Sequence, residues 1–85
     1  MVLGVVTGCV WATKKAPGLG GLALLLVARE DGGPPFAAAD TLGAGPGDRV
    51  LAAFGGAARQ AAGRDCPVDA AIVGIVDREE ENVCL

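Results

Sequence analysis

The sequence predicts a mostly β fold in one small domain, residues 1–85, and three observations lead to this prediction. A chain of 85 residues is long enough for a single small domain. Short apolar runs rich in β-branched residues alternate with turns rich in glycine and proline, as expected for several short strands. Only the stretch from Gly55 to Gly63 combines residue types that favour a helix.

The first two predicted strands are separated by a glycine-rich loop. Val2 to Thr13 has many β-branched residues and no helical periodicity, so we expect a strand in which Gly4 and Gly8 mark bends or bulges. Lys14 to Gly21 contains Pro-Gly and Gly-Gly pairs, which predict a loop. Leu22 to Ala28 is an apolar run of strand length.

Two more strands are predicted in the middle of the chain. Asp31 to Pro35 is a strong turn signal, and Phe36 to Asp40 after it has the length of a short strand. We expect a tight, irregular loop from Gly43 to Asp48. Arg49 to Phe54 then resumes the strand pattern.

The last third of the chain supplies the helix and a further strand. The flanking glycines limit the helix at residues 55–63 to about two turns. Val68 to Asp77 is predicted as a strand, and Asn82 to Leu85 as a stub of edge strand. Several short strands with one small helix favour a partly open β-barrel of the OB type.

The composition predicts a small core. Hydrophobic residues make up 52% of the chain, but 16 of them are alanine, beside 9 leucines, 10 valines and 2 isoleucines. Small side chains bury little area per residue, and short chains bury a small fraction of their surface. These properties exclude a multidomain protein and a deep-pocket enzyme, and they favour a domain that finishes burying its surface against copies of itself.

Charge and residue usage disfavour several function classes. The net charge is −3 and the only adjacent basic pair is Lys14-Lys15, whereas nucleic-acid binding needs clustered basic residues. The absence of histidine removes the usual acid–base catalyst and the partner of a nucleophilic serine or cysteine. We expect no catalytic residues, no metal, no cofactor and no nucleic-acid partner.

The cysteines and the apolar runs indicate a cytosolic location. Cys9, Cys66 and Cys84 form no C-x-x-C motif, so we expect small, buried, reduced side chains. No secretory signal is visible, and the apolar runs fall short of the ~20 residues that span a bilayer. We therefore expect a soluble chain without a membrane partner.

The most unusual motif is the loop Gly43-Ala44-Gly45-Pro46-Gly47. Glycine at every second position allows positive φ and close approach of backbones. The loop lacks the Lys-Ser/Thr of a phosphate-binding P-loop and the spacing of a dinucleotide site. A tight structural turn is the main interpretation, and packing of the loop against symmetry-related copies is the alternative.

The charged residues allow more than one role. Arg59 lies in an alanine-rich stretch, either as a solvated helix charge or in an ion pair with Asp40 or Asp69, within or between subunits. Glu79 to Glu81 is interpreted as a solvated surface, because adjacent glutamates do not converge on a cation. Catalysis by paired carboxylates is disfavoured, since no aspartate has a setting that indicates a raised pKa or a substrate cleft.

Five segments, taken in order, resemble those of a known family. Asp40 to Val50 (DTLGAGPGDRV) is similar to its diagnostic D-x-hydrophobic-G-A-G-x-G-acidic-x-V stretch, and Pro67 to Asp77 to its P-V-D-x-x-I-x-G-I-V-D strand. Met1 to Lys15 and Leu22 to Val27 resemble its first two strands, and Ala58 to Gln60 falls at its A-R-Q. The family is EutN/CcmL, the pentameric vertex proteins of bacterial microcompartment shells.

The resemblance implies a five-stranded OB-like barrel that assembles as a cyclic homopentamer. Such pentamers cap the fivefold vertices of a polyhedral shell whose facets are hexameric and trimeric proteins. The resemblance places residues 43–47 near the fivefold axis and makes Asp48, Arg59 and Asp69 candidates for contacts between subunits. A structural role without catalysis follows, in carboxysomes or in catabolic compartments.

Two departures from the family pattern carry expectations of their own. Gly56-Ala57 stands where Ser-Ser is common, so hydroxyl groups that line or brace a pore are missing. The final strand after Asp77 is expected to be shortened or charged, with a thinner contact between subunits. The alternative function is a small OB-type binding module for an oligosaccharide or another ligand, with Trp11 as its main stacking residue.

Overall fold

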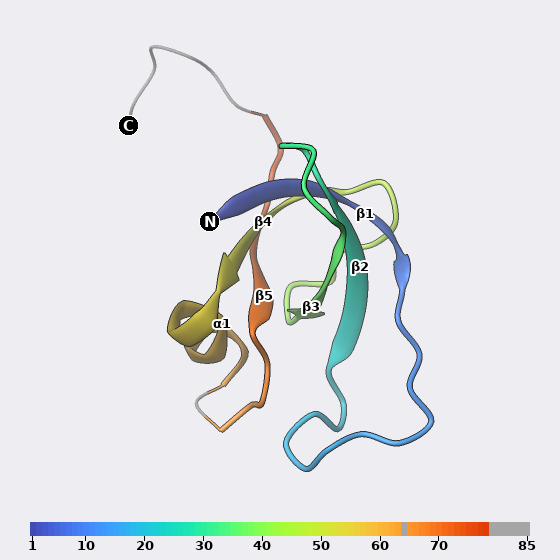
Figure 1. Ribbon diagram of the computed structural model, residues 1–85, viewed down its shortest axis with the longest axis vertical. Coiled ribbons are helices and arrows are strands. Elements are labelled where there is room, and N and C mark those ends of the chain that lie inside the picture. Colours follow the sequence, from blue (N-terminus) through green and yellow to red (C-terminus); the bar gives the residue numbers. More distant parts are fainter. Residues whose placement is uncertain (64, 79–85) are drawn as a thin grey trace.

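A computed structural model describes residues 1–63 and 65–78. Figure 1 shows strands wrapped around a common interior, with one short helix on the outside. In chain order the elements are β1 (Val2–Cys9), β2 (Ala23–Arg29), β3 (Phe36–Asp40), β4 (Arg49–Phe54), α1 (Gly55–Ala62) and β5 (Ala70–Ile75).

The strands form a closed barrel in the order β1-β2-β3-β5-β4. The five-stranded barrel that the resemblance implied is confirmed. The sequence predicted it as partly open, whereas the structure has it closed. Every neighbouring pair is antiparallel except β3 and β5, which are parallel and share the single register pair Ala39↔Ala71. The β3–β5 pair closes the barrel, so every strand has a neighbour on both sides for at least part of its length.

β3 and β4 have the predicted bounds, as do the starts of β1 and α1, whereas six other boundaries were wrong: the ends of β1 and α1 and both ends of β2 and β5. β1 ends at Cys9 instead of Thr13, because the Val10 N–H makes the last bond to β2, to the Leu24 carbonyl oxygen. β2 runs one residue later than predicted at both ends, and α1 ends one residue earlier. β5 is shorter than residues 68–77, because the Val68 N–H turns back to the Cys66 carbonyl oxygen.

Gly4 and Gly8 of β1 occupy different structural settings. The register against β2 shifts between Val6 and Gly8, so the predicted irregularity at Gly8 is a bulge. Gly4 lies in regular ladder, where a Cβ would fall 2.5 Å from Val27 Cγ1 and 2.6 Å from the Ala28 carbonyl oxygen. Gly4 is therefore required by close packing of β1 against β2.

Two apolar layers hold the fold together. The barrel interior is filled by side chains of moderate size: Val6, Leu25, Val27, Ala38, Val50, Ala70 and Ile72. Outside the barrel, α1 packs on the sheet through the alanines Ala39, Ala58 and Ala71, each no more than 2% exposed. Alanine at all three positions lets the helix lie close to the strands, and this explains part of the alanine-rich composition.

The cysteines divide between the core and the surface. Cys66 is buried, as predicted, but Cys9 is exposed, which contradicts the expectation of a buried thiol. Cys9 pairs with Leu25 as the last residue of β1, and the chain leaves the sheet directly after it. Cys84, the acidic run 79–81 and the predicted edge strand 82–85 lie outside the described residues.

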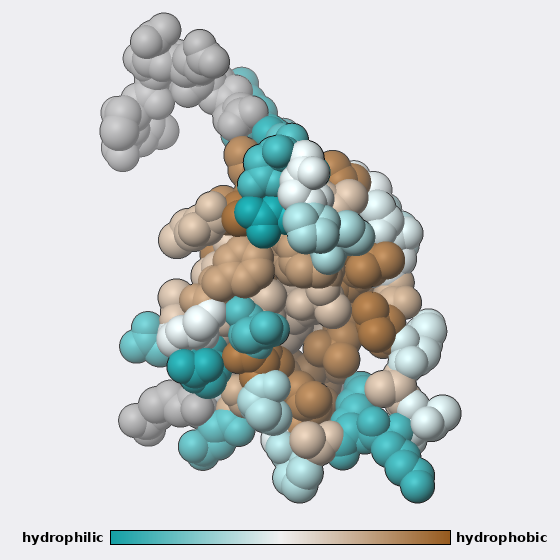
Figure 2. Space-filling model, viewed as in Figure 1, coloured by the Kyte–Doolittle hydropathy of each residue, from teal (hydrophilic) through white to brown (hydrophobic). Residues whose placement is uncertain are grey.

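Apolar surface extends over the middle of the molecule between more polar ends, as Figure 2 shows. The large apolar side chains that remain exposed include Trp11 at 91%, Leu42 at 50% and Leu26 at 39%. In the described part of the chain, the one helix has eight residues, too few to cross a bilayer.

Candidate functional site

The loop between β3 and β4 is built around the carboxylate of Asp40. Its Oδ1 accepts the Leu42 N–H at 2.9 Å, and its Oδ2 accepts the Ala44 N–H at 3.0 Å. Asp40 is 8% exposed, the one buried charged side chain among the residues that the structure describes. Both oxygens are therefore satisfied by the loop that follows β3.

A second aspartate closes the other end of the loop. Asp48 Oδ2 accepts the Gly45 N–H at 2.9 Å, and the Asp48 N–H donates to the Gly45 carbonyl oxygen at 3.0 Å. The loop is also fixed to β1, because Val6 exchanges backbone hydrogen bonds with Gly47 and Asp48. Ala44 packs against the barrel interior. The loop is thus a rigid projection of the barrel.

The three glycines of this loop are not equivalent. Gly43 and Gly47 have φ of 85° and 90°, where residues with a side chain are strained. Gly45 has no such conformation, and a Cβ added to it would meet nothing within 4 Å. The fold of the single chain therefore requires glycine at 43 and 47 but not at 45.

The predicted ion pairs of Arg59 do not form within the chain. Arg59 is exposed in α1, and within the described residues it makes no salt bridge to Asp40 or Asp69. Asp69 is exposed as well, and its carbonyl oxygen accepts the Gly55 N–H at the start of the helix. In the single chain Arg59 is therefore a solvated helix charge, and the carboxylate of Asp40 instead accepts the Leu42 and Ala44 N–H groups.

Two ion pairs at the end of β2, near Arg29, were not predicted from the sequence. Arg29 makes two hydrogen bonds to Asp31, at 2.8 and 2.9 Å, and Arg49 makes two to Glu30. The guanidinium of Arg29 and the Gly33 N–H lower the pKa of Asp31 to about 2. Hydrogen bonding to Arg49 lowers the pKa of Glu30. The adjacent charges at residues 29–31 were a signal for the Arg29–Asp31 pair. The Glu30–Arg49 pair could be predicted only from the strand register.

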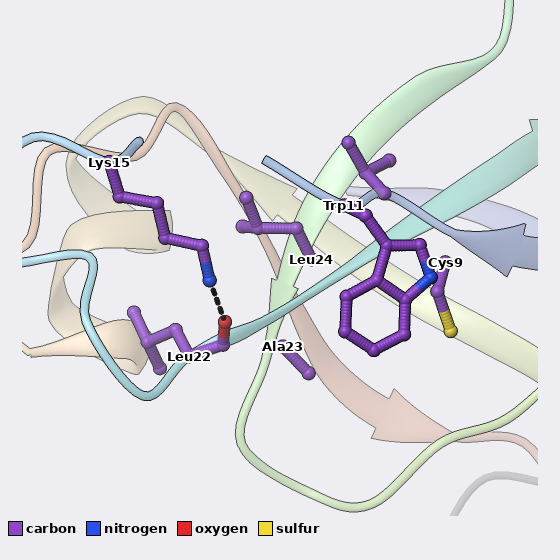
Figure 3. Close-up of a pocket in the computed structure, with 7 residues that line it drawn as sticks. Cys9, Trp11, Lys15, Leu22, Ala23 and Leu24 are labelled. Carbon is purple, nitrogen blue, oxygen red and sulfur yellow. Dashed lines mark hydrogen bonds between the residues drawn. The ribbon is translucent and has the colours of Figure 1, made fainter. Parts of the chain in front are cut away.

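A shallow hollow lies beside Trp11. It measures about 110 Å³, and its walls include Cys9, Leu22 and Leu24. Figure 3 shows the indole between Cys9 on one side and Ala23 and Leu24 on the other, with Lys15 bonded to the Leu22 carbonyl oxygen. No group of three or more candidate ligands for a metal ion occurs in residues 1–63 and 65–78.

Comparisons with known proteins extend over nearly the whole chain. The family model described as "Ethanolamine utilisation protein EutN/carboxysome" matches residues 1–77. The shell vertex protein GrpN of Rhodospirillum rubrum is 46% identical over 87 residues, covering 94% of this chain and 97% of that protein. The carboxysome shell vertex protein CcmL of Synechocystis is 46% identical over 83 residues, covering 91% of this chain and 83% of that protein.

A solved structure gives the same relationship in three dimensions. It is described as the GrpN pentameric microcompartment shell protein from Rhodospirillum rubrum. Its TM-score is 0.83 at 44% identity, with 94% of this chain and 98% of that chain covered. The barrel, the outer helix and the loop between β3 and β4 therefore have counterparts in a protein whose assembly is a pentamer.

Proposed function

Because the chain belongs to the EutN/CcmL family, we propose that it is a structural shell protein whose homopentamers cap the fivefold vertices of a polyhedral bacterial microcompartment. The observation that carries the proposal is the match of the whole barrel to a pentameric shell protein at a TM-score of 0.83. Residues 1–85 then form one vertex domain, located in the shell of the compartment and without catalytic activity.

A head-to-tail ring suits the physical properties of the single chain. In a closed ring each subunit presents two different faces, one to each neighbour. Trp11 and Leu26 remain exposed on a barrel whose interior is filled by small and medium side chains. Contact between subunits would remove this apolar surface from water, and each Å² buried would stabilise the assembly by roughly 25 cal/mol.

We assign the loop of residues 43–47 to the neighbourhood of the fivefold axis. The support is its rigid bracing by Asp40 and Asp48, and a glycine at 45 that the single chain does not require. Arg59 and Asp69 are exposed charges without an ion pair in the described chain, so each is available to a neighbouring subunit. Asp48 is the third contact residue in this proposal.

The partners outside the pentamer are the hexameric and trimeric proteins of the shell facets. A flat layer of hexagonal tiles does not close, and twelve fivefold positions supply the missing curvature in any closed polyhedron of this kind. No cofactor, nucleic acid or membrane takes part in this function.

Native mass spectrometry with co-expression tests the proposal. The purified chain is expected to give a pentamer, and omission of its gene from a set of co-expressed shell proteins is expected to yield open or elongated shells in electron micrographs. A monomer over a wide concentration range would overturn the pentamer and would favour a small ligand-binding barrel.

A further inference from the structure

Trp11 is the most exposed aromatic side chain of the described residues. Its surface is 91% accessible, and it lies two residues after the end of β1, with the indole clear of the barrel interior. In Figure 3 the indole lies between Cys9 and Ala23, at the end of the hollow away from Lys15. An indole carries a large apolar area, and tryptophan is enriched among the residues that dominate protein interfaces.

A second apolar groove, which shares Leu24 with the hollow beside Trp11, lies between the loop before β2 and the segment before β5. It measures about 180 Å³ and is lined mainly by Leu19, Leu24, Ala37, Pro67 and Val68. Alanines on β3 leave this space open, because a larger side chain there would fill it. The groove is open to solvent, so a planar aromatic ring can lie against its apolar walls and be partly buried there.

The charges next to the indole and the groove are complementary. Lys14 and Lys15 follow Trp11 closely in sequence and are exposed. Asp69, the one charged residue among those that line the groove, is exposed at its edge. Within the described part of the chain, neither Lys14 nor Asp69 makes an ion pair. A tryptophan seated in the groove of another copy would bring a lysine to this aspartate.

We propose that Trp11 of each subunit occupies the groove of the next subunit around the ring, with Lys14 beside Asp69. This inference rests on the proposed pentamer, whose head-to-tail contact needs two different complementary patches on every subunit. The indole and the groove are two such patches, which adjoin at Leu24: Trp11 is not among the residues that line the groove. The contact buries the exposed indole and pairs two charges that the single chain leaves in solvent.

The chain carries its own probe for this contact, because Trp11 is its only tryptophan. Fluorescence of the wild-type protein is measured together with native mass spectrometry across a dilution series. In assembled protein the emission is expected at shorter wavelength, with weak quenching by iodide. Dissociation is expected to shift the emission to longer wavelength and to increase quenching, in parallel with loss of the pentamer.

Variants test the contact between Trp11 and the groove separately from the formation of the pentamer. Trp11→Ala is expected to weaken each subunit contact about 30-fold or more, as for a buried interface tryptophan. Lys14→Glu is expected to weaken assembly, and Asp69→Lys in the same chain to restore it. Asp65→Lys, at an exposed acid outside the groove lining, is the matched control and is expected to leave assembly unchanged.

The outcomes distinguish the two levels of the proposal. A monomeric wild-type protein would overturn the proposed function and this contact with it. A wild-type pentamer whose tryptophan stays open to iodide, or a Trp11→Ala variant that assembles as well as wild type, would overturn the Trp11 contact alone. Failure of Asp69→Lys to rescue Lys14→Glu would overturn the pairing of these two residues.

Discussion

Arg49, the first residue of β4, and Glu30, which directly follows β2, form an ion pair across β1, the strand between β2 and β4. The guanidinium Nε and Nη2 of Arg49 lie 2.5 and 2.6 Å from the two carboxylate oxygens of Glu30. Arg49 is opposite Val5 in the sheet, and the Glu30 N–H donates to the Leu3 carbonyl oxygen. The pair therefore fastens β2 and β4 over the outer face of β1.

Glu30→Gln is expected to lower the melting temperature most at neutral pH. The pKa of Glu30 is lower in the folded chain than in the unfolded chain, because Arg49 stabilises the carboxylate. Its stabilisation is complete above the ordinary glutamate pKa of about 4.3 and is lost as the pH falls through the folded value. Thermal unfolding of both proteins between pH 7 and pH 3 should show the difference shrinking toward zero. A difference that stays constant with pH would contradict this role of the charge.

Asp40→Asn is expected to destabilise the fold through the loop between β3 and β4. The amide keeps one acceptor, but its NH₂ group then faces one of the two backbone N–H groups that Asp40 now binds. Loss of a hydrogen bond to a buried charged acceptor costs about 1.5–3 kcal/mol. Urea denaturation measures the cost. The matched variant Asp65→Asn, at an exposed site, should stay within about 0.5 kcal/mol of wild type.

Gly4→Ala and Gly8→Ala are expected to differ although both lie in β1. At Gly4 a Cβ would clash with Val27 Cγ1 and with the backbone of Ala28, so the strands must separate. At Gly8 a Cβ meets nothing within 4 Å. We expect a loss of about 1–3 kcal/mol or more for Gly4→Ala and no loss for Gly8→Ala, from urea denaturation. Equal effects at both positions would show that the β1–β2 packing is not the reason for Gly4.

Gly45→Ala is expected to have opposite effects on the fold and on the assembly. The substitution introduces no clash and no backbone strain in the single chain, and it reduces the entropy of the unfolded chain. The free energy of unfolding should therefore rise by about 0.4–1 kcal/mol. If residues 43–47 of neighbouring subunits meet at the fivefold axis, the same methyl group should weaken the pentamer in native mass spectra. Pentamers as stable as wild type would place Gly45 away from that contact.

Strand bounds were predicted well where local turn chemistry sets them. Residues 36–40 follow the turn Asp31–Pro35, and residues 49–54 end at Gly55, which has a positive φ of 64°. β1 was predicted too long, because its β-branched pattern continues past the last residue that has a partner on β2. β1 ends where its pairing with β2 ends, at Cys9↔Leu25, although β2 itself continues to Ala23 against β3, and that information is not local.

The sequence predicted a tight loop at residues 43–47 but not the hydrogen bonds that hold it. Alternate glycines marked residues 43–47, since two of the three need positive φ. Asp40 was considered as a partner of Arg59, yet its carboxylate binds the loop that follows it. Short-range backbone bonds compete with a distant guanidinium, and sequence alone does not rank them. The Glu30–Arg49 pair likewise depends on the register of three strands.

The single register pair between β3 and β5 has a consequence for how the chain folds. The β1–β2 and β2–β3 hairpins join residues close in sequence, whereas Ala39 meets Ala71 only after β4 and α1 lie between them. Contacts that close long loops form late, because the entropy of closure is lost before they contribute. The β1–β4 ladder also closes a long loop, but it has four register pairs against one between β3 and β5. The weaker β3–β5 junction is therefore expected to form last, together with the packing of α1 on Ala39 and Ala71.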